Sequence, residues 1–101
     1  MMDRREMDRV LRRVDDAVNS TVGYTHVQAL AVEEDVNGLA RRYAEEAVAG
    51  GHADKAADPA LMDACESMLG ILGLRPRMAA GQYASAMVQW YIDQIKEDRN
   101  G

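Results

Sequence analysis

The sequence predicts an all-α fold, a small bundle of four helices. The 101-residue chain is rich in Ala, Leu and Met, with seven Met, but has one Trp and no Phe, a balance that favours helices over strands. Apolar residues also recur at helical spacing in four stretches, which Gly, Pro and short polar segments separate. We expect a single helical domain, residues 1–101, because this length is typical of one compact unit.

The first helix is expected at residues 4–19. Asp3 can cap its first turn, and Glu6 three residues later completes a capping box. Its apolar residues fall at i, i+3, i+4, i+7, i+10 and i+11, one stripe along the helix: Met7, Val10, Leu11, Val14, Ala17 and Val18. A second helix is expected at residues 26–49, after a cap at Thr25, with a stripe of Val32, Val36, Leu39, Ala40, Tyr43 and Ala47.

The pair Asn37-Gly38 interrupts this second stripe in sequence but not in phase. A glycine inside a helix costs about 1 kcal/mol, which a helix of this length tolerates. The preserved period therefore predicts a helix that continues through the pair. Gly38 could instead mark the place where another helix crosses closely.

The third helix, residues 59–72, has the strongest start signal in the chain. Asp58 can act as the cap and Pro59 occupies the first helical position, where its missing N–H has no cost. At the other end, Gly73 can adopt the left-handed conformation, Leu74 can fold back onto Leu69, and Pro76 prevents continuation. The segment from His52 to Ala57 is expected to be a polar connection.

The fourth helix, residues 79–97, carries more apolar side chains than one neighbouring helix can cover. One stripe runs through Ala80, Ala84, Met87, Val88, Tyr91 and Ile95, and a second through Tyr83, Met87, Trp90 and Gln94. Exposed aromatic residues and Met are typical of protein interfaces. We therefore expect a partner interface, in a homodimer or a heterologous complex, formed by Tyr83, Met87, Trp90, Tyr91 and Gln94.

Charge and cysteine content restrict the setting. The net charge of −5 disfavours broad binding of nucleic acids, although five of the twelve basic residues lie within residues 4–13. A face made by Arg5, Arg9, Arg12 and Arg13 could meet an anionic partner such as RNA, but the nearby acids favour a solvated face. The single cysteine, the charged N-terminal residues and the lack of a long apolar segment predict a cytoplasmic protein that does not span a membrane.

No catalytic, cofactor or metal site is expected. His26 and His52 do not belong to the Glu-x-x-His pairs of metal-binding bundles, and Cys65 lies on an apolar helix side where a buried thiol is inert. Gly50-Gly51 ends a helix, whereas a phosphate-binding glycine loop precedes one. These observations argue against an enzyme.

Three segments together resemble a known family: HVQALAVEEDVNGLARRYAEEA, DPALMDACESMLGILGLRP and QWYIDQIKEDR. From about Arg9 to Arg99 the chain is similar to the DALR domain, the helical domain that follows the catalytic core of cysteinyl-tRNA synthetases. The resemblance implies helices that support recognition of the tRNA anticodon stem. The chain has NSTVGYTHV where that domain opens with Asp-Asp-x-x-Thr-Pro, and it has none of the synthetase's nucleotide or zinc motifs, so aminoacylation does not carry over.

Three classes of function remain open at this point. The apolar face of residues 79–97 favours a small non-enzymatic protein-interaction module: an accessory subunit, adaptor or inhibitor, for example one encoded by a phage or mobile element. The Arg-rich first helix would suit an RNA-associated helical module. A pocket between the helices would suit a small ligand-binding protein or enzyme.

Overall fold

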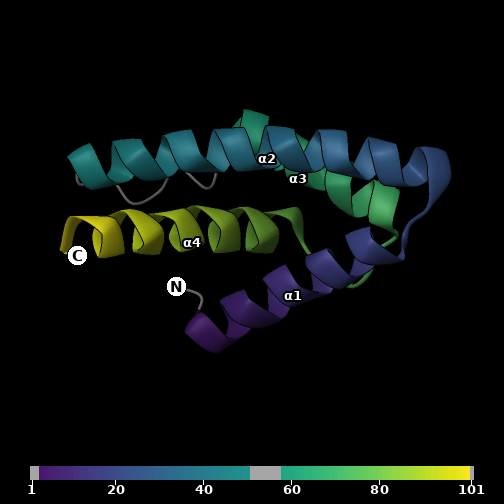
Figure 1. Cartoon of the computed structure of the whole chain (residues 1–101), viewed down its shortest axis with the longest axis horizontal. Helices are drawn as coiled ribbons and strands as arrows, with labels where there is room; N and C mark the ends of the chain where they lie inside the picture. Colours follow the sequence, from purple (N-terminus) through teal and green to yellow (C-terminus); the bar gives the residue numbers. More distant parts are fainter. Residues whose placement is uncertain (1–2, 51–57, 101) are drawn as a thin grey trace.

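A computed structural model of the chain describes residues 3–50 and 58–100 (Figure 1). These residues form four helices and no strand: α1 (Arg4–Ser20), α2 (Gly23–Gly50), α3 (Pro59–Leu72) and α4 (Ala80–Asn100). The predicted all-α class and the four-helix bundle are thereby confirmed. The predicted polar connection, His52 to Ala57, lies outside the described residues.

The four helices alternate in direction along the chain (Figure 1). As a result α2 and α4 run the same way, and they pack together more extensively than any other pair, followed by α2 with α3. Helix α1 diverges from α2 at an angle, and its main contact is with α4. Helix α4 therefore lies in the middle of the bundle, with all three other helices packed against it.

The helix ends follow the signals in the sequence. Asp3 accepts a 2.8 Å hydrogen bond from the Glu6 N–H, and Asp58 accepts one of 2.9 Å from the Ala60 N–H. The Glu6 side chain makes no return bond to the Asp3 N–H, so the predicted capping box is only half formed. Helix α4 begins one residue later than predicted and ends at Asn100.

Helix α3 stops as its sequence predicts. Gly73 has φ +70°, the left-handed conformation. Its N–H donates to the Gly70 carbonyl at 3.3 Å, and the Leu74 N–H donates to the Leu69 carbonyl at 2.9 Å. These two bonds define a Schellman motif, and Leu74 packs against the core beside it.

Helix α2 differs from its prediction at the start and agrees in the middle. It begins at Gly23 instead of after Thr25, because Gly23 adopts φ +62° and turns the chain directly out of α1. Helix α2 continues without a break through Asn37-Gly38, as expected. A side chain placed at Gly38 would meet nothing within 4 Å, so the alternative of a close helix crossing there is wrong.

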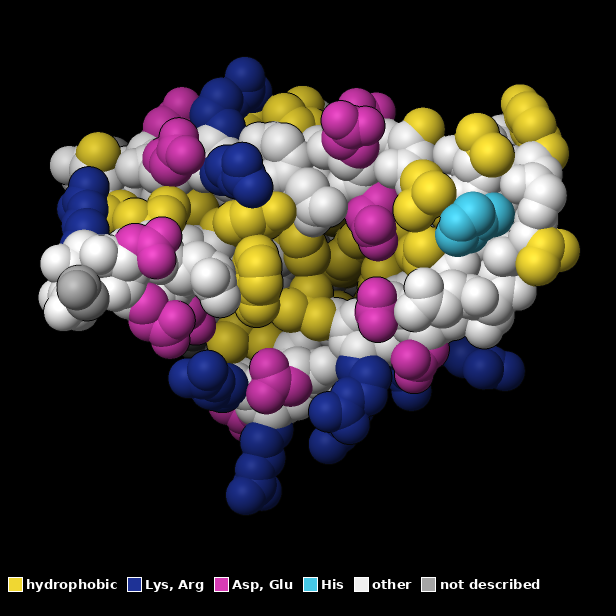
Figure 2. Space-filling view, in the orientation of Figure 1, with side chains coloured by type: hydrophobic (Ala, Val, Ile, Leu, Met, Phe, Trp, Pro, Cys, Tyr) yellow, Lys and Arg dark blue, Asp and Glu magenta, His cyan; other side chains and the backbone are white. Residues whose placement is uncertain are grey.

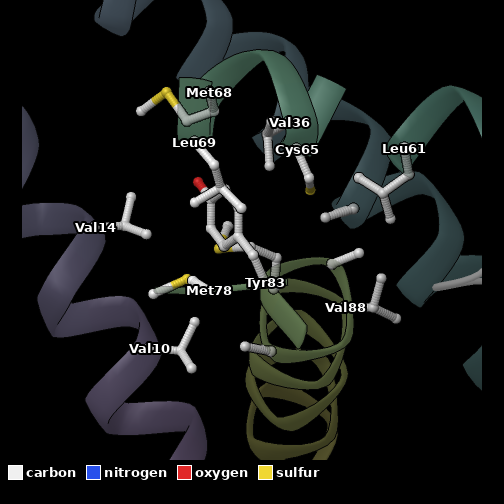
Figure 3. Close-up of a cluster of buried hydrophobic side chains, with 14 of the residues drawn as sticks. Val10, Val14, Val36, Leu61, Cys65, Met68, Leu69, Met78, Tyr83 and Val88 are labelled. Atoms are coloured by element: carbon white, nitrogen blue, oxygen red, sulfur yellow. The ribbon is translucent and has the colours of Figure 1, made fainter. Parts of the chain in front are cut away.

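The core contains buried residues from all four helices (Figure 3). Val10 and Val14 come from α1, Val36 from α2, Leu61 from α3, and Tyr83 from α4. Figure 3 shows the Tyr83 ring in the middle of this cluster. The Cα radius of gyration, 13.4 Å, is close to the 13 Å or so typical of a 100-residue domain.

Candidate partner-binding surfaces

The predicted interface on α4 is partly core. Tyr83 is 1% exposed and Met87 is 8% exposed, so neither side chain presents a surface to a partner. The physical reason is the central place of α4: its wide apolar sector is covered by α1, α2 and α3 together. The expectation that a single copy could not cover this sector is corrected for these two residues.

The outer part of the α4 face remains accessible. Trp90 is 41% exposed, Gln94 is exposed, and Tyr91 is half-buried. The Trp90 and Tyr91 rings meet edge to face at 4.8 Å between centroids, and the Arg41 guanidinium lies 5.3 Å from the centre of the Tyr91 ring. Tyr91 is therefore held between two neighbours, and Trp90 is the most exposed large apolar side chain of this face.

A larger exposed apolar surface lies where α1 meets α2. Four large side chains stand out there: Val22 is 81% exposed, Tyr24 78%, Val27 63% and Leu30 45%. We call these four residues the corner patch. Figure 2 shows hydrophobic side chains gathered at this end of the molecule, on the right of the view.

Sequence reasoning missed the corner patch because it placed the start of the second helix after Thr25 and began its stripe at Val32. With the helix starting at Gly23, Tyr24, Val27 and Leu30 follow each other at intervals of three, on a side that the other helices do not cover. One feature of the sequence indicates the patch: the first turns of this helix carry apolar residues on more than one side. A helix that is buried along a single face needs apolar residues on that face only.

The surroundings of the corner patch are acidic. Residues 14–40 contain five carboxylates and no Lys or Arg: Asp15, Asp16, Glu33, Glu34 and Asp35. Figure 2 shows basic side chains mostly along the lower edge, over α1. It also shows a hollow between α1 and α2 that is floored by hydrophobic side chains and has acidic side chains on its rim.

Glu33 of α2 and Asp15 of α1 are electrostatically coupled across this corner. Partial burial raises the pKa of the Glu33 carboxyl above its ordinary value, and the negative charge of Asp15 raises the pKa further. The acidic charge beside the patch is thus crowded and not balanced by a base in the same segment. A positively charged group arriving here would relieve that repulsion.

The predicted anionic-partner face is divided by the structure. Arg9 and Arg13 line a cleft of about 150 Å³ together with Arg77, which comes from the connection between α3 and α4. Arg5 and Arg12 are exposed elsewhere on α1 and do not line this cleft. We call the cleft the Arg cleft; its full lining is Glu6, Arg9, Val10, Arg13, Arg77, Met78 and Gln82.

The remaining polar candidates are structural. The His26 ring nitrogen Nδ1 lies 3.3 Å from the Val18 carbonyl and 3.3 Å from the Thr21 hydroxyl, which itself donates to that carbonyl at 2.8 Å, so both residues close the end of α1. Cys65 is fully buried, and desolvation raises the pKa of its thiol to about 12. Residues 3–50 and 58–100 contain no group of three His, Cys, Asp or Glu residues placed to hold a metal ion.

Within the same residues, no helix combines the length and the apolar character that a membrane crossing requires. Comparisons with protein-family models, with curated proteins and with solved structures found no match for the chain. The resemblance to the synthetase domain therefore stays a prediction.

Proposed function

We propose that this chain is a small protein-interaction module and that its corner patch binds a basic amphipathic segment of another protein. The observation that carries the proposal is the exposure of Val22, Tyr24, Val27 and Leu30 at one corner of an otherwise well-packed bundle. Such a module could serve as an adaptor, an accessory subunit or an inhibitor.

The size of the patch supports a docking role. Four large apolar side chains that are 45–81% exposed amount to a few hundred Å², the size at which exposed patches of monomers often mark interaction sites. Val and Leu contribute apolar area, and Tyr24 adds a rigid ring with a polar tip, a combination that is enriched in interfaces. In a helix-in-groove complex, two or three apolar side chains of a bound helix would contact these residues.

The charge of the corner decides which kind of partner fits. A partner with Lys or Arg beside its apolar residues would face the five carboxylates of residues 14–40 with complementary charge. A second copy docked through the same patch would bring two such acidic corners together, because a two-fold interface places the same surface on both sides. The charges therefore favour a basic partner over self-association.

The test measures binding of a fluorescently labelled 14-residue helical peptide by fluorescence polarisation. The peptide has Leu at i, i+3, i+4 and i+7 and Lys at the remaining positions. Val27→Ser and Tyr24→Ser should each weaken binding at least tenfold, because about 1.4 kcal/mol corresponds to a factor of ten and burial of such a side chain contributes 1.5–3 kcal/mol or so. The matched control is Trp90→Ser, which removes the exposed apolar side chain of α4 and should leave the affinity unchanged.

A peptide with every Lys replaced by Glu should not bind, and added salt should weaken the Lys peptide. Equal binding of both peptides, or loss of binding in Trp90→Ser alone, would contradict the proposal. Sedimentation of the free protein tests whether a second copy of the chain occupies the patch instead. A dimer that Val27→Ser converts to a monomer would show that it does.

A further inference from the structure

We infer that the Arg cleft binds a single phosphate group. The cleft lies between α1 and the start of α4, and the segments that line it are far apart in the sequence. Arg9 and Arg13 are four residues apart on α1 and so lie on one side of that helix, while Arg77 approaches from the connection that precedes α4. Folding thus brings three arginines into the lining of one small cavity.

The charges in the Arg cleft are not balanced by the rest of the described chain. None of the three guanidinium groups makes a hydrogen bond or ion pair with a residue of 3–50 or 58–100. Other arginines of the chain are engaged: Arg75 donates to the Glu66 carbonyl at 3.1 Å, and Arg42 lies 5.4 Å from the centre of the Tyr43 ring. Glu6 is the single carboxylate in the lining, which leaves two net positive charges.

Folding gains nothing from holding three like charges together, and their mutual repulsion opposes it. A bound anion would convert that repulsion into attraction. A phosphate dianion would match the two net positive charges of the lining.

The dimensions of the cleft select a phosphate group and not a larger ligand. Its volume of about 150 Å³ is well below the 300–1,000 Å³ or so of pockets that hold whole drug-sized ligands. A phosphate group, with five non-hydrogen atoms or fewer, is small enough for such a cleft. The planar guanidinium group also matches phosphate oxygens with two parallel N–H···O bonds.

The walls of the cleft suit an anion as well. Val10 and Met78 are buried core residues and form an apolar base, which strengthens electrostatic attraction above it. Gln82 belongs to the first turn of α4, where the helix dipole is positive, and its amide can donate a further hydrogen bond.

An extended nucleic-acid backbone fits this surface less well than one phosphate group. Binding of a backbone needs a track of basic residues, but Arg5 and Arg12 of the same helix lie outside the cleft. Acidic residues also alternate with the arginines along α1, among them Asp8, and the chain as a whole carries a net charge of −5. The phosphate could be free inorganic phosphate or a phosphate monoester, and the cleft recognises the chemistry that both share.

The experiment is an NMR titration of the ¹⁵N-labelled protein with inorganic phosphate at constant ionic strength, repeated with phosphoserine and with a ten-nucleotide single-stranded RNA. We expect saturable shifts of the backbone amides of Val10, Met78 and Gln82. Arg9→Gln, Arg13→Gln and Arg77→Gln should each weaken phosphate binding at least fivefold, whereas Arg5→Gln and Arg12→Gln on the same helix should not.

Thermal unfolding gives an independent readout. Phosphate stabilises proteins in general by exclusion from their surface, so the informative quantity is the difference between variants. A phosphate-dependent rise in Tm that is larger in Arg5→Gln than in Arg77→Gln supports the site. Without phosphate, Arg77→Gln should be at least as stable as the unsubstituted chain, since it relieves repulsion.

Two sets of results would overturn the inference. Phosphate shifts that do not saturate, or equal stabilisation of all five variants, would show that the cleft has no specific site. RNA binding that Arg5→Gln and Arg12→Gln weaken as much as Arg9→Gln and Arg13→Gln would show an extended nucleic-acid face in its place. If phosphate and phosphoserine both bind but one is favoured, the preference identifies the source of the group.

Discussion

A pair of leucine substitutions tests whether the corner patch is a true surface. Leu61 of α3 is fully buried, whereas Leu30 of α2 is 45% exposed. Replacing each by Ala deletes the same atoms from the same residue type, so the difference between the two variants measures burial alone. Leu61→Ala is expected to destabilise the protein strongly, and Leu30→Ala only slightly.

The magnitudes follow from the structure. At Leu61 the lost transfer free energy and the cavity left in the core together give about 3 kcal/mol, within the range of about 2–5 kcal/mol for buried Leu→Ala changes. That is a large share of the 5–15 kcal/mol or so that stabilises an ordinary domain. At Leu30 we expect a loss below about 1 kcal/mol, because much of the side chain is already in water and Ala favours the helix.

The assay is urea unfolding followed by circular dichroism at 222 nm. With a slope of about 1–3 kcal/mol per molar urea, Leu61→Ala should lower the midpoint by about 1–3 M, and Leu30→Ala should lower it at most about a third as much. Equal losses in the two variants would refute the assignment of Leu30 to an exposed surface. A loss at Leu30 that grows with protein concentration would show that a second copy covers it.

Three further changes test individual contacts. Asp58→Ala should lower the free energy of unfolding by about 2 kcal/mol in a urea titration. The substitution removes the α3 cap and also the hydrogen bond from the Tyr43 hydroxyl, which raises the Tyr43 pKa. Asp58→Asn can still cap the helix and should cost less. Tyr83→Phe should change the free energy of unfolding by less than about 1 kcal/mol, since the Tyr83 hydroxyl makes no hydrogen bond with a described residue that Phe would lose; a larger loss would contradict this. Glu33→Gln should raise Tm at pH 7, because the raised pKa of Glu33 means that the fold disfavours the charged carboxylate. The stability gained with Gln is complete above the pKa of Glu33 in the folded protein. It disappears as the pH falls to 4.5, the ordinary pKa of the group. An advantage of Glu33→Gln that is independent of pH would show that charge is not its cause.

The helices could be predicted from the sequence wherever local signals set their ends. Asp58-Pro59 and Gly73 fix both ends of α3, and the observed helix has the predicted bounds. The start of α2 could not be predicted in the same way, because Gly23 can open a helix or remain in a loop. What decides it is the turn out of α1, where Thr21 and His26 bond to the Val18 carbonyl.

The candidate sites depended on information that no single helix contains. The pattern of α4 shows a wide apolar sector but not how many helices will cover it, and three of them bury Tyr83 and Met87. Arg9 and Arg13 could be recognised as neighbours on one helix. Their approach to Arg77 arises only when the α3–α4 connection folds beside α1, which is a long-range contact.

The corner patch has its origin in unequal helix lengths. At 1.5 Å per residue, the 28 residues of α2 span about 42 Å, whereas the 14 residues of α3 span about 21 Å and the 21 residues of α4 about 32 Å. The longest dimension of the molecule, 40 Å, is thus set by α2 alone. Because α4 begins well inside the bundle and α1 diverges (Figure 1), the first turns of α2 extend beyond the helices that could bury them. The apolar side chains on those turns therefore contribute little to packing within the described chain, and a docked helix would cover what the bundle leaves open: Tyr24, Val27 and Leu30.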